Sequence, residues 1–134
     1  MKYLLDVNAL LALGVESHEF HSRVATWLWD LHRSTDQQLA TCSITELGFV
    51  RIVSQVPAYG CTLAEARSLL QRLKARSIVK FKFLPDDQDL SKLPDWVSYP
   101  RQLTDGHLLE LTRAHDAVLA TLDKGIIEAF LIPD

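Results

Sequence analysis

The sequence predicts an α/β protein, a three-layer α/β/α sandwich with a central, mostly parallel sheet. Strand-like runs alternate with helix-like runs along all 134 residues. The connections between successive strands are too long for hairpins, which is typical of parallel crossovers. Hydrophobic residues make up 48% of the chain and charged residues 23%, an ordinary globular composition. We therefore expect one domain over residues 1–134.

The amino-terminal region predicts one buried strand and two helices. Residues 2–5 are apolar enough for a short buried strand. A helix pattern follows over residues 8–13, and Gly14 ends it. A second helix should begin after Ser17 as its N-cap and run to about residue 33, with apolar residues at helical spacing.

The next region predicts a second strand and two further helices. Residues 38–42 form the strand, and the following helix runs over residues 43–53. Thr62 and Glu65 have the spacing of a capping box, which indicates the start of another helix. The residues of that helix expected to face inward are Leu63, Ala66, Leu69, Leu70 and Leu73.

The second half of the sequence predicts an edge strand, a long loop, a helix, another strand, and then a short helix with a final strand. Residues 79–84 alternate apolar side chains with lysines, a pattern typical of a protected sheet edge. Residues 85–100 are rich in Asp and Pro and should form a loop. Thr104 can cap a helix that ends near residue 115, and a strand is expected at 117–121. Residues 126–132 should form a short helix and a final strand.

Acidic residues lie at four places where a strand-like run gives way to a turn or a helix. They are Asp6, Glu46, Asp105 and Asp123. Because such ends collect at one edge of an open parallel sheet, these carboxylates can meet there. Crowded carboxylates repel one another unless a divalent cation neutralises them, and Mg²⁺ or Mn²⁺ suits oxygen ligands. The sequence therefore predicts one acidic metal site.

Each of these acids also has a purely structural explanation. Asp6 could N-cap the helix that follows it, and Glu46 could close a capping box with Ser43. Asp105 could complement the dipole of its own helix, and Asp123 could be an ordinary turn residue. The expected convergence of all four at one sheet edge favours the metal site.

Charge and cysteine content limit the partners and the compartment. The net charge of -3 and pI near 5.9 give no global attraction to nucleic acid, so binding to a polyanion requires a local basic patch or a metal. Cys42 and Cys61 form no CxxC pair, which favours a reducing cytoplasm. Asp6 and Asn8 interrupt the apolar start of the chain, which argues against a signal peptide. We expect a soluble cytoplasmic protein.

A run of basic residues lies in the sequence between Glu46 and Asp105 of the predicted site. Residues 67–82 contain six basic residues and no acidic one: Arg67, Arg72, Lys74, Arg76, Lys80 and Lys82. This run could follow an RNA backbone, or it could be a solvated helix face next to a lysine-protected edge strand. The five histidines have no zinc-like spacing, and surface positions are expected for them.

Four short motifs around the acids resemble the PIN domain family, in particular VapC-type toxins of bacterial toxin–antitoxin pairs. The motifs are LLDVNAL at 4–10, SITELGFVR at 43–51, LTDGHLL at 103–109 and ATLD at 120–123. The likeness covers nearly the whole chain. It implies a PIN-like fold and a metal-dependent endoribonuclease in which Asp6, Glu46, Asp105 and Asp123 hold one or two Mg²⁺ or Mn²⁺ ions.

The resemblance also implies a mechanism and partners. A bound cation would generate a hydroxide nucleophile for in-line attack on an RNA phosphodiester. Asp6 and Asp105 would be direct ligands, Glu46 a ligand or a water-orienting base, and Asp123 a ligand of a second ion or one acting through water. Asn8, Thr104 and Thr121 could orient these carboxylates or be plain caps and strand residues. Such toxins usually form homodimers and are masked by a cognate antitoxin that covers the acidic groove.

The sequence leaves three alternative function classes, of which the first two fit less well. A phosphotransferase of the haloacid dehalogenase type needs a second Asp where this chain has Asn8. A receiver domain needs an early acidic pair, which is missing here, and Asp86, Asp87 and Lys124 match its other positions only loosely. A non-catalytic α/β interaction module would use the four acids as caps and turns.

Overall fold

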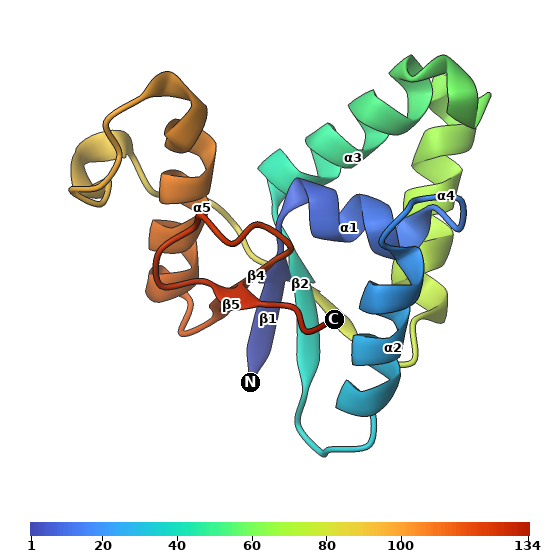
Figure 1. Ribbon diagram of the computed structural model, residues 1–134, viewed down its shortest axis with the longest axis horizontal. Coiled ribbons are helices and arrows are strands. Elements are labelled where there is room, and N and C mark those ends of the chain that lie inside the picture. The colour runs from blue at the N-terminus through green and yellow to red at the C-terminus, as the bar shows by residue number, and fades with distance from the viewer.

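A computed structural model describes all residues from Met1 to Asp134 and has a five-stranded sheet at its centre (Figure 1). The strand order is β3-β2-β1-β4-β5, and every neighbouring pair is parallel. The strands are β1 (Lys2–Leu5), β2 (Gln38–Thr41), β3 (Phe81–Phe83), β4 (Val118–Thr121) and β5 (Phe130–Leu131). The predicted parallel sheet is confirmed, and β3 lies at its edge as the lysine pattern indicates.

Helices cover both faces of this sheet, which confirms the three-layer α/β/α class. They are α1 (Val7–Gly14), α2 (His21–Leu31), α3 (Ser43–Gln55), α4 (Leu63–Arg76) and α5 (Leu103–Ala114). Figure 1 shows α1 to α4 on one side and α5 on the other. The larger core of 18 buried residues joins α1 to α4 to the sheet, and a smaller core of nine lies under α5. None of the helices α1 to α5 has the length and apolar character that a membrane span requires.

The predicted start of α4 is confirmed by its hydrogen bonds. At the start of α4, the Glu65 backbone N–H donates to the Thr62 hydroxyl at 3.1 Å, and the Thr62 N–H donates to the Glu65 carboxylate at 2.9 Å. One inward position of this helix was predicted wrongly, since Leu63 is 60% exposed. Ala66 and Leu70 are buried as expected.

Other boundaries differ from the prediction for local reasons. Helix α2 begins at His21, because turns closed by His18 N–H to Val15 O and His21 N–H to His18 O occupy the preceding residues. Helix α5 begins at Leu103, one residue before its predicted cap, because a 3₁₀ turn over Pro100–Gln102 leads into it. The predicted short helix after residue 126 is wrong, since turns occupy that segment and Glu128 has a left-handed φ of 70°.

The long loop of residues 85–100 packs against α5. His107 of α5 lies 2.6 Å from the Asp86 carboxylate (Nε2 to Oδ2), and its exposure is 7%, so the expected surface position is wrong for this histidine. A Cβ added at Gly106 would lie 2.4 Å from Val97 Cγ2, so glycine permits the close approach of the loop. These contacts fix the start of α5, where Asp105 lies.

Candidate active site

Three of the four predicted acids line one cavity at the carboxyl end of the sheet. Asp6 follows β1, Asp123 follows β4 and Asp105 lies in the first turn of α5. The cavity has a volume of about 320 Å³, and Asn8 and Thr104 also line it. The sheet topology explains this grouping, because β1 and β4 are neighbours and end at the same edge.

Asp6 is buried and hydrogen-bonded through both carboxylate oxygens. Oδ1 accepts the Ala9 backbone N–H at 2.8 Å, so the N-cap explanation for this residue is correct. Oδ2 accepts the Thr121 hydroxyl at 2.6 Å. Burial raises the pKa of Asp6, the two hydrogen bonds oppose that rise, and the charge of Asp123 adds to it. Since a carboxylate oxygen can accept more than one bond, the cap leaves room for a further ligand.

Asp105 is half-buried at the amino-terminal end of α5. Burial, followed by the negative charges of Asp6 and Asp123, raises the pKa of Asp105 to about 6. An acid shifted so far by burial and by its acidic neighbours is typical of a functional site. The pKa of Asp105 is thus affected by the charges of both other carboxylates that line the cavity.

Asp123 takes part in the turn that follows β4. Its Oδ1 accepts the Gly125 backbone N–H at 2.8 Å, so the turn explanation holds for this residue too. Its own backbone N–H donates to the Thr121 hydroxyl at 3.0 Å. Thr121 is therefore hydrogen-bonded both to Asp6, which follows β1, and to Asp123, which follows its own strand β4.

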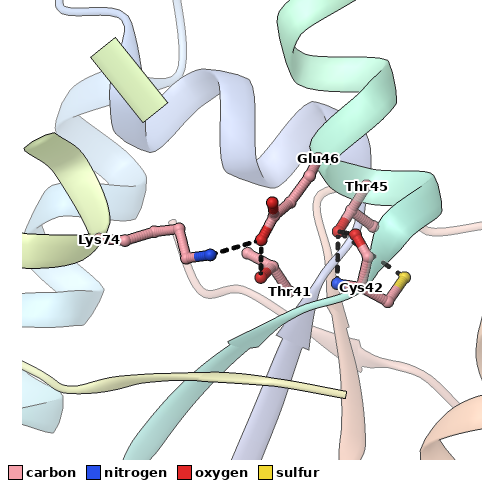
Figure 2. Close-up of polar contacts among 5 residues, drawn as sticks. All are labelled: Thr41, Cys42, Thr45, Glu46 and Lys74. Carbon is pink, nitrogen blue, oxygen red and sulfur yellow. Dashed lines mark hydrogen bonds and ion pairs between the residues drawn. The ribbon is translucent and has the colours of Figure 1, made fainter. Parts of the chain in front are cut away.

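Glu46 is paired with a lysine (Figure 2) and is not among the residues that line the three-aspartate cavity. Its Oε2 accepts the Thr41 hydroxyl at 2.5 Å and lies 2.6 Å from Lys74 Nζ. Glu46 lines a separate cavity of about 610 Å³ between α3 and α4, together with Arg67 and Phe83. The expected convergence of four acids is therefore seen for three of them.

The capping alternative for Glu46 is wrong. The cap of α3 is formed one residue earlier, where the Cys42 backbone N–H donates to the Thr45 hydroxyl at 3.0 Å (Figure 2). Glu46 lies in the first turn of α3, where its charge also complements the helix dipole.

The donor chemistry of the three-aspartate cavity fits a hard divalent cation. Carboxylates line it and the Asn8 side chain borders it, all with the oxygen donors that Mg²⁺ and Mn²⁺ prefer. Burial, and after it the charges of Asp6 and Asp123, raise the pKa of Asp105, and a cation there would favour its ionised form. As the side chains stand, no three His, Cys, Asp or Glu residues are grouped closely enough to hold a metal ion.

Lys74 and Thr41 contact an acid of the predicted site, although the sequence pattern assigns no individual role to either residue. Lys74 belongs to the basic run, and its partner Glu46 lies 28 residues away, so local spacing carries no signal of the pair. Thr41 ends β2 as Thr121 ends β4, and each donates to an acid of the predicted site. A threonine at the last position of a strand, shortly before an acid of the predicted site, is the sequence signal that could have identified Thr41. The other five basic residues of the run are exposed.

Several known proteins that are similar to this chain share one family name. No protein-family model matches the chain. The sequence is 40% identical over 127 positions to Ribonuclease VapC38 of Mycobacterium tuberculosis (strain ATCC 25618 / H37Rv), covering 92% of this chain and 86% of that protein. It is 35% identical over 139 positions to Ribonuclease VapC29 of the same strain, covering 99% and 98%. Ribonuclease VapC44 of that strain is 35% identical over 130 positions, covering 94% and 89%.

Proposed function

This chain belongs to the VapC-type PIN-domain ribonucleases, the toxins of toxin–antitoxin pairs, and on that basis we propose that it is an endoribonuclease dependent on Mg²⁺ or Mn²⁺. Its substrate is RNA, and its reaction is hydrolysis of a phosphodiester bond. The interaction-module and phosphotransferase alternatives are not favoured, because proteins similar over most of the chain are named ribonucleases.

The observation that carries this proposal is the cavity shared by Asp6, Asp105 and Asp123. When bound, a divalent cation supplies a nucleophilic hydroxide and stabilises negative charge on the phosphoryl oxygens. The raised pKa of Asp105, caused by burial and by its two acidic neighbours, supports a site that needs positive charge.

The residues around the cavity have distinct tasks under this proposal. Asp6 and Asp105 are direct metal ligands, and Asp123 acts on a second ion or through water. Thr121 and the Ala9 N–H fix the orientation of the Asp6 carboxylate, which limits its freedom before the metal arrives. Glu46 is a ligand or a water-orienting base, and for this it must leave Lys74.

RNA, an antitoxin and a second copy of the chain are the proposed partners. With a net charge of -3, the protein must attract RNA through local features, and the exposed basic residues of α4 and the following strand offer one. The family implies a cognate antitoxin protein, and a homodimer is the oligomeric state that we propose. Size-exclusion chromatography with light scattering tests the dimer directly.

The substitution Asp6→Asn tests the site with little risk to the fold. Asn is as good an N-cap as Asp, so α1 should keep its cap while the cavity loses one negative charge. We expect normal circular dichroism and no RNA cleavage. A folded Asp6→Asn protein with full cleavage activity would refute the proposed site.

A further inference from the structure

Of the four proposed site acids, only Glu46 forms a salt bridge with a basic side chain. Lys74 Nζ lies 2.6 Å from Glu46 Oε2, and the two side chains are only 29% and 24% exposed. Such limited exposure strengthens an ion pair relative to one in open solvent. Lys74 therefore supplies to Glu46 the positive charge that a metal would supply to the aspartates.

Surrounding groups hold both members of this pair in place. The Thr41 hydroxyl, which is fully buried at the end of β2, donates to the same Glu46 oxygen at 2.5 Å (Figure 2). On the other side, Lys74 Nζ lies 5.9 Å from the centre of the Phe83 ring, within range of a cation–π contact. Glu46 is thus directed to the α3–α4 cavity, whereas the aspartates line another.

We propose that Lys74 is a positioning residue that holds Glu46 away from the three-aspartate cavity and competes with the divalent cation for its carboxylate. The inference rests on the proposed metal-dependent function. Its consequence is that Glu46 joins the site only when the cation outcompetes Lys74. Lys74 thereby weakens metal binding in the RNA-free protein.

A nonspecific electrostatic effect would mimic part of this behaviour. Removing any positive charge near an acidic site favours cation binding, whatever that charge contacts. Arg67 provides the matched control, because it lies on the same helix, lines the Glu46 cavity and forms no salt bridge. The variant Arg67→Met removes one charge without breaking the Glu46 hydrogen bonds.

The test is a titration of Mn²⁺ into the 134-residue protein, in which the electron paramagnetic resonance signal of free Mn²⁺ is measured. Wild type, Lys74→Met, Lys74→Gln, Arg67→Met, Glu46→Gln and the double variant Glu46→Gln/Lys74→Met are compared, each with its thermal unfolding curve. We expect the two Lys74 variants to bind Mn²⁺ about fivefold more tightly than wild type, or better. Arg67→Met should stay within about twofold of wild type.

The double variant decides whether the effect passes through Glu46. We expect Glu46→Gln/Lys74→Met to bind Mn²⁺ as Glu46→Gln does. Equal tightening in Arg67→Met, persistent tightening in the Glu46→Gln background, or no tightening in folded Lys74 variants would overturn the inference.

Mn²⁺ binding by the Asp105→Asn variant distinguishes a failure of this inference from a failure of the proposed function. If wild type binds Mn²⁺ and Asp105→Asn does not, the metal site stands and the Lys74 variants alone decide the inference. If wild type binds no Mn²⁺, or Asp105→Asn binds it equally well, both the metal site and the role of Lys74 are refuted.

Discussion

The hydroxyl of Thr121 donates a 2.6 Å hydrogen bond to the carboxylate of Asp6, across the ends of two neighbouring parallel strands. The same hydroxyl accepts the Asp123 backbone N–H at 3.0 Å. Thr41 repeats the arrangement at the end of β2, where it donates to Glu46. Buried strand-terminal threonines therefore orient two of the acids that the proposed function requires.

Replacing Thr121 by Val should lower both stability and activity. The buried Asp6 carboxylate would lose its hydroxyl donor, so we expect the free energy of unfolding at pH 7 to fall by about 1–3 kcal/mol. Urea denaturation measures this loss, and RNA cleavage should fall with it. Thr121→Ser keeps the hydroxyl and serves as the control. Unchanged stability in Thr121→Val would show that the hydrogen bond does not hold Asp6.

Without metal, the stability of the protein should carry a pH dependence that arises from Asp105. Burial and the charges of Asp6 and Asp123 raise the pKa of Asp105 to about 6, whereas the unfolded chain has a pKa near 4. The folded state therefore binds a proton more tightly there, which stabilises it at low pH. This stabilisation is lost as the pH rises through about 6.

Urea denaturation in EDTA at pH 5 and pH 7.5 tests this behaviour on wild type and Asp105→Asn. The difference between the two proteins isolates Asp105 from other titrating groups. We expect Asp105→Asn to gain stability relative to wild type at the higher pH. A difference that is the same at both pH values would contradict the raised pKa.

Gly48 should be required for the close packing of α3 against α1. A Cβ at this position would lie 2.7 Å from Val7 Cγ2, and a helical valine has little freedom to rotate away. Although Gly→Ala favours a helix, we expect Gly48→Ala to lower the unfolding free energy by about 1 kcal/mol net. Adding Val7→Ala should remove the clash, so the double variant should be less destabilised than the sum of the single ones.

The fold could be predicted from the sequence because its signals are local and repeated. Apolar strands followed by helix patterns predict the parallel crossovers, and Lys80 and Lys82 mark the edge strand. Two errors about helices came from local backbone conformation. The left-handed Glu128 prevents the expected carboxyl-terminal helix, and the turns before His21 delay α2.

The grouping of Asp6, Asp105 and Asp123 could be predicted for a topological reason. Each lies at a strand end or a helix start on one edge of the sheet, so chain order alone brings them near one another. The orientation of Glu46 could not, because it depends on a lysine from a different helix. Long-range side-chain pairs of this kind leave no periodic signal.

We propose that the three-aspartate cavity performs metal-dependent RNA hydrolysis. The decisive experiment incubates the purified protein with total cellular RNA and Mg²⁺ or Mn²⁺, beside an EDTA control and Asp105→Asn. We expect cleavage that EDTA abolishes and that the folded Asp105→Asn protein lacks. Equal cleavage by Asp105→Asn, or cleavage that persists in EDTA, would refute the proposed metal site.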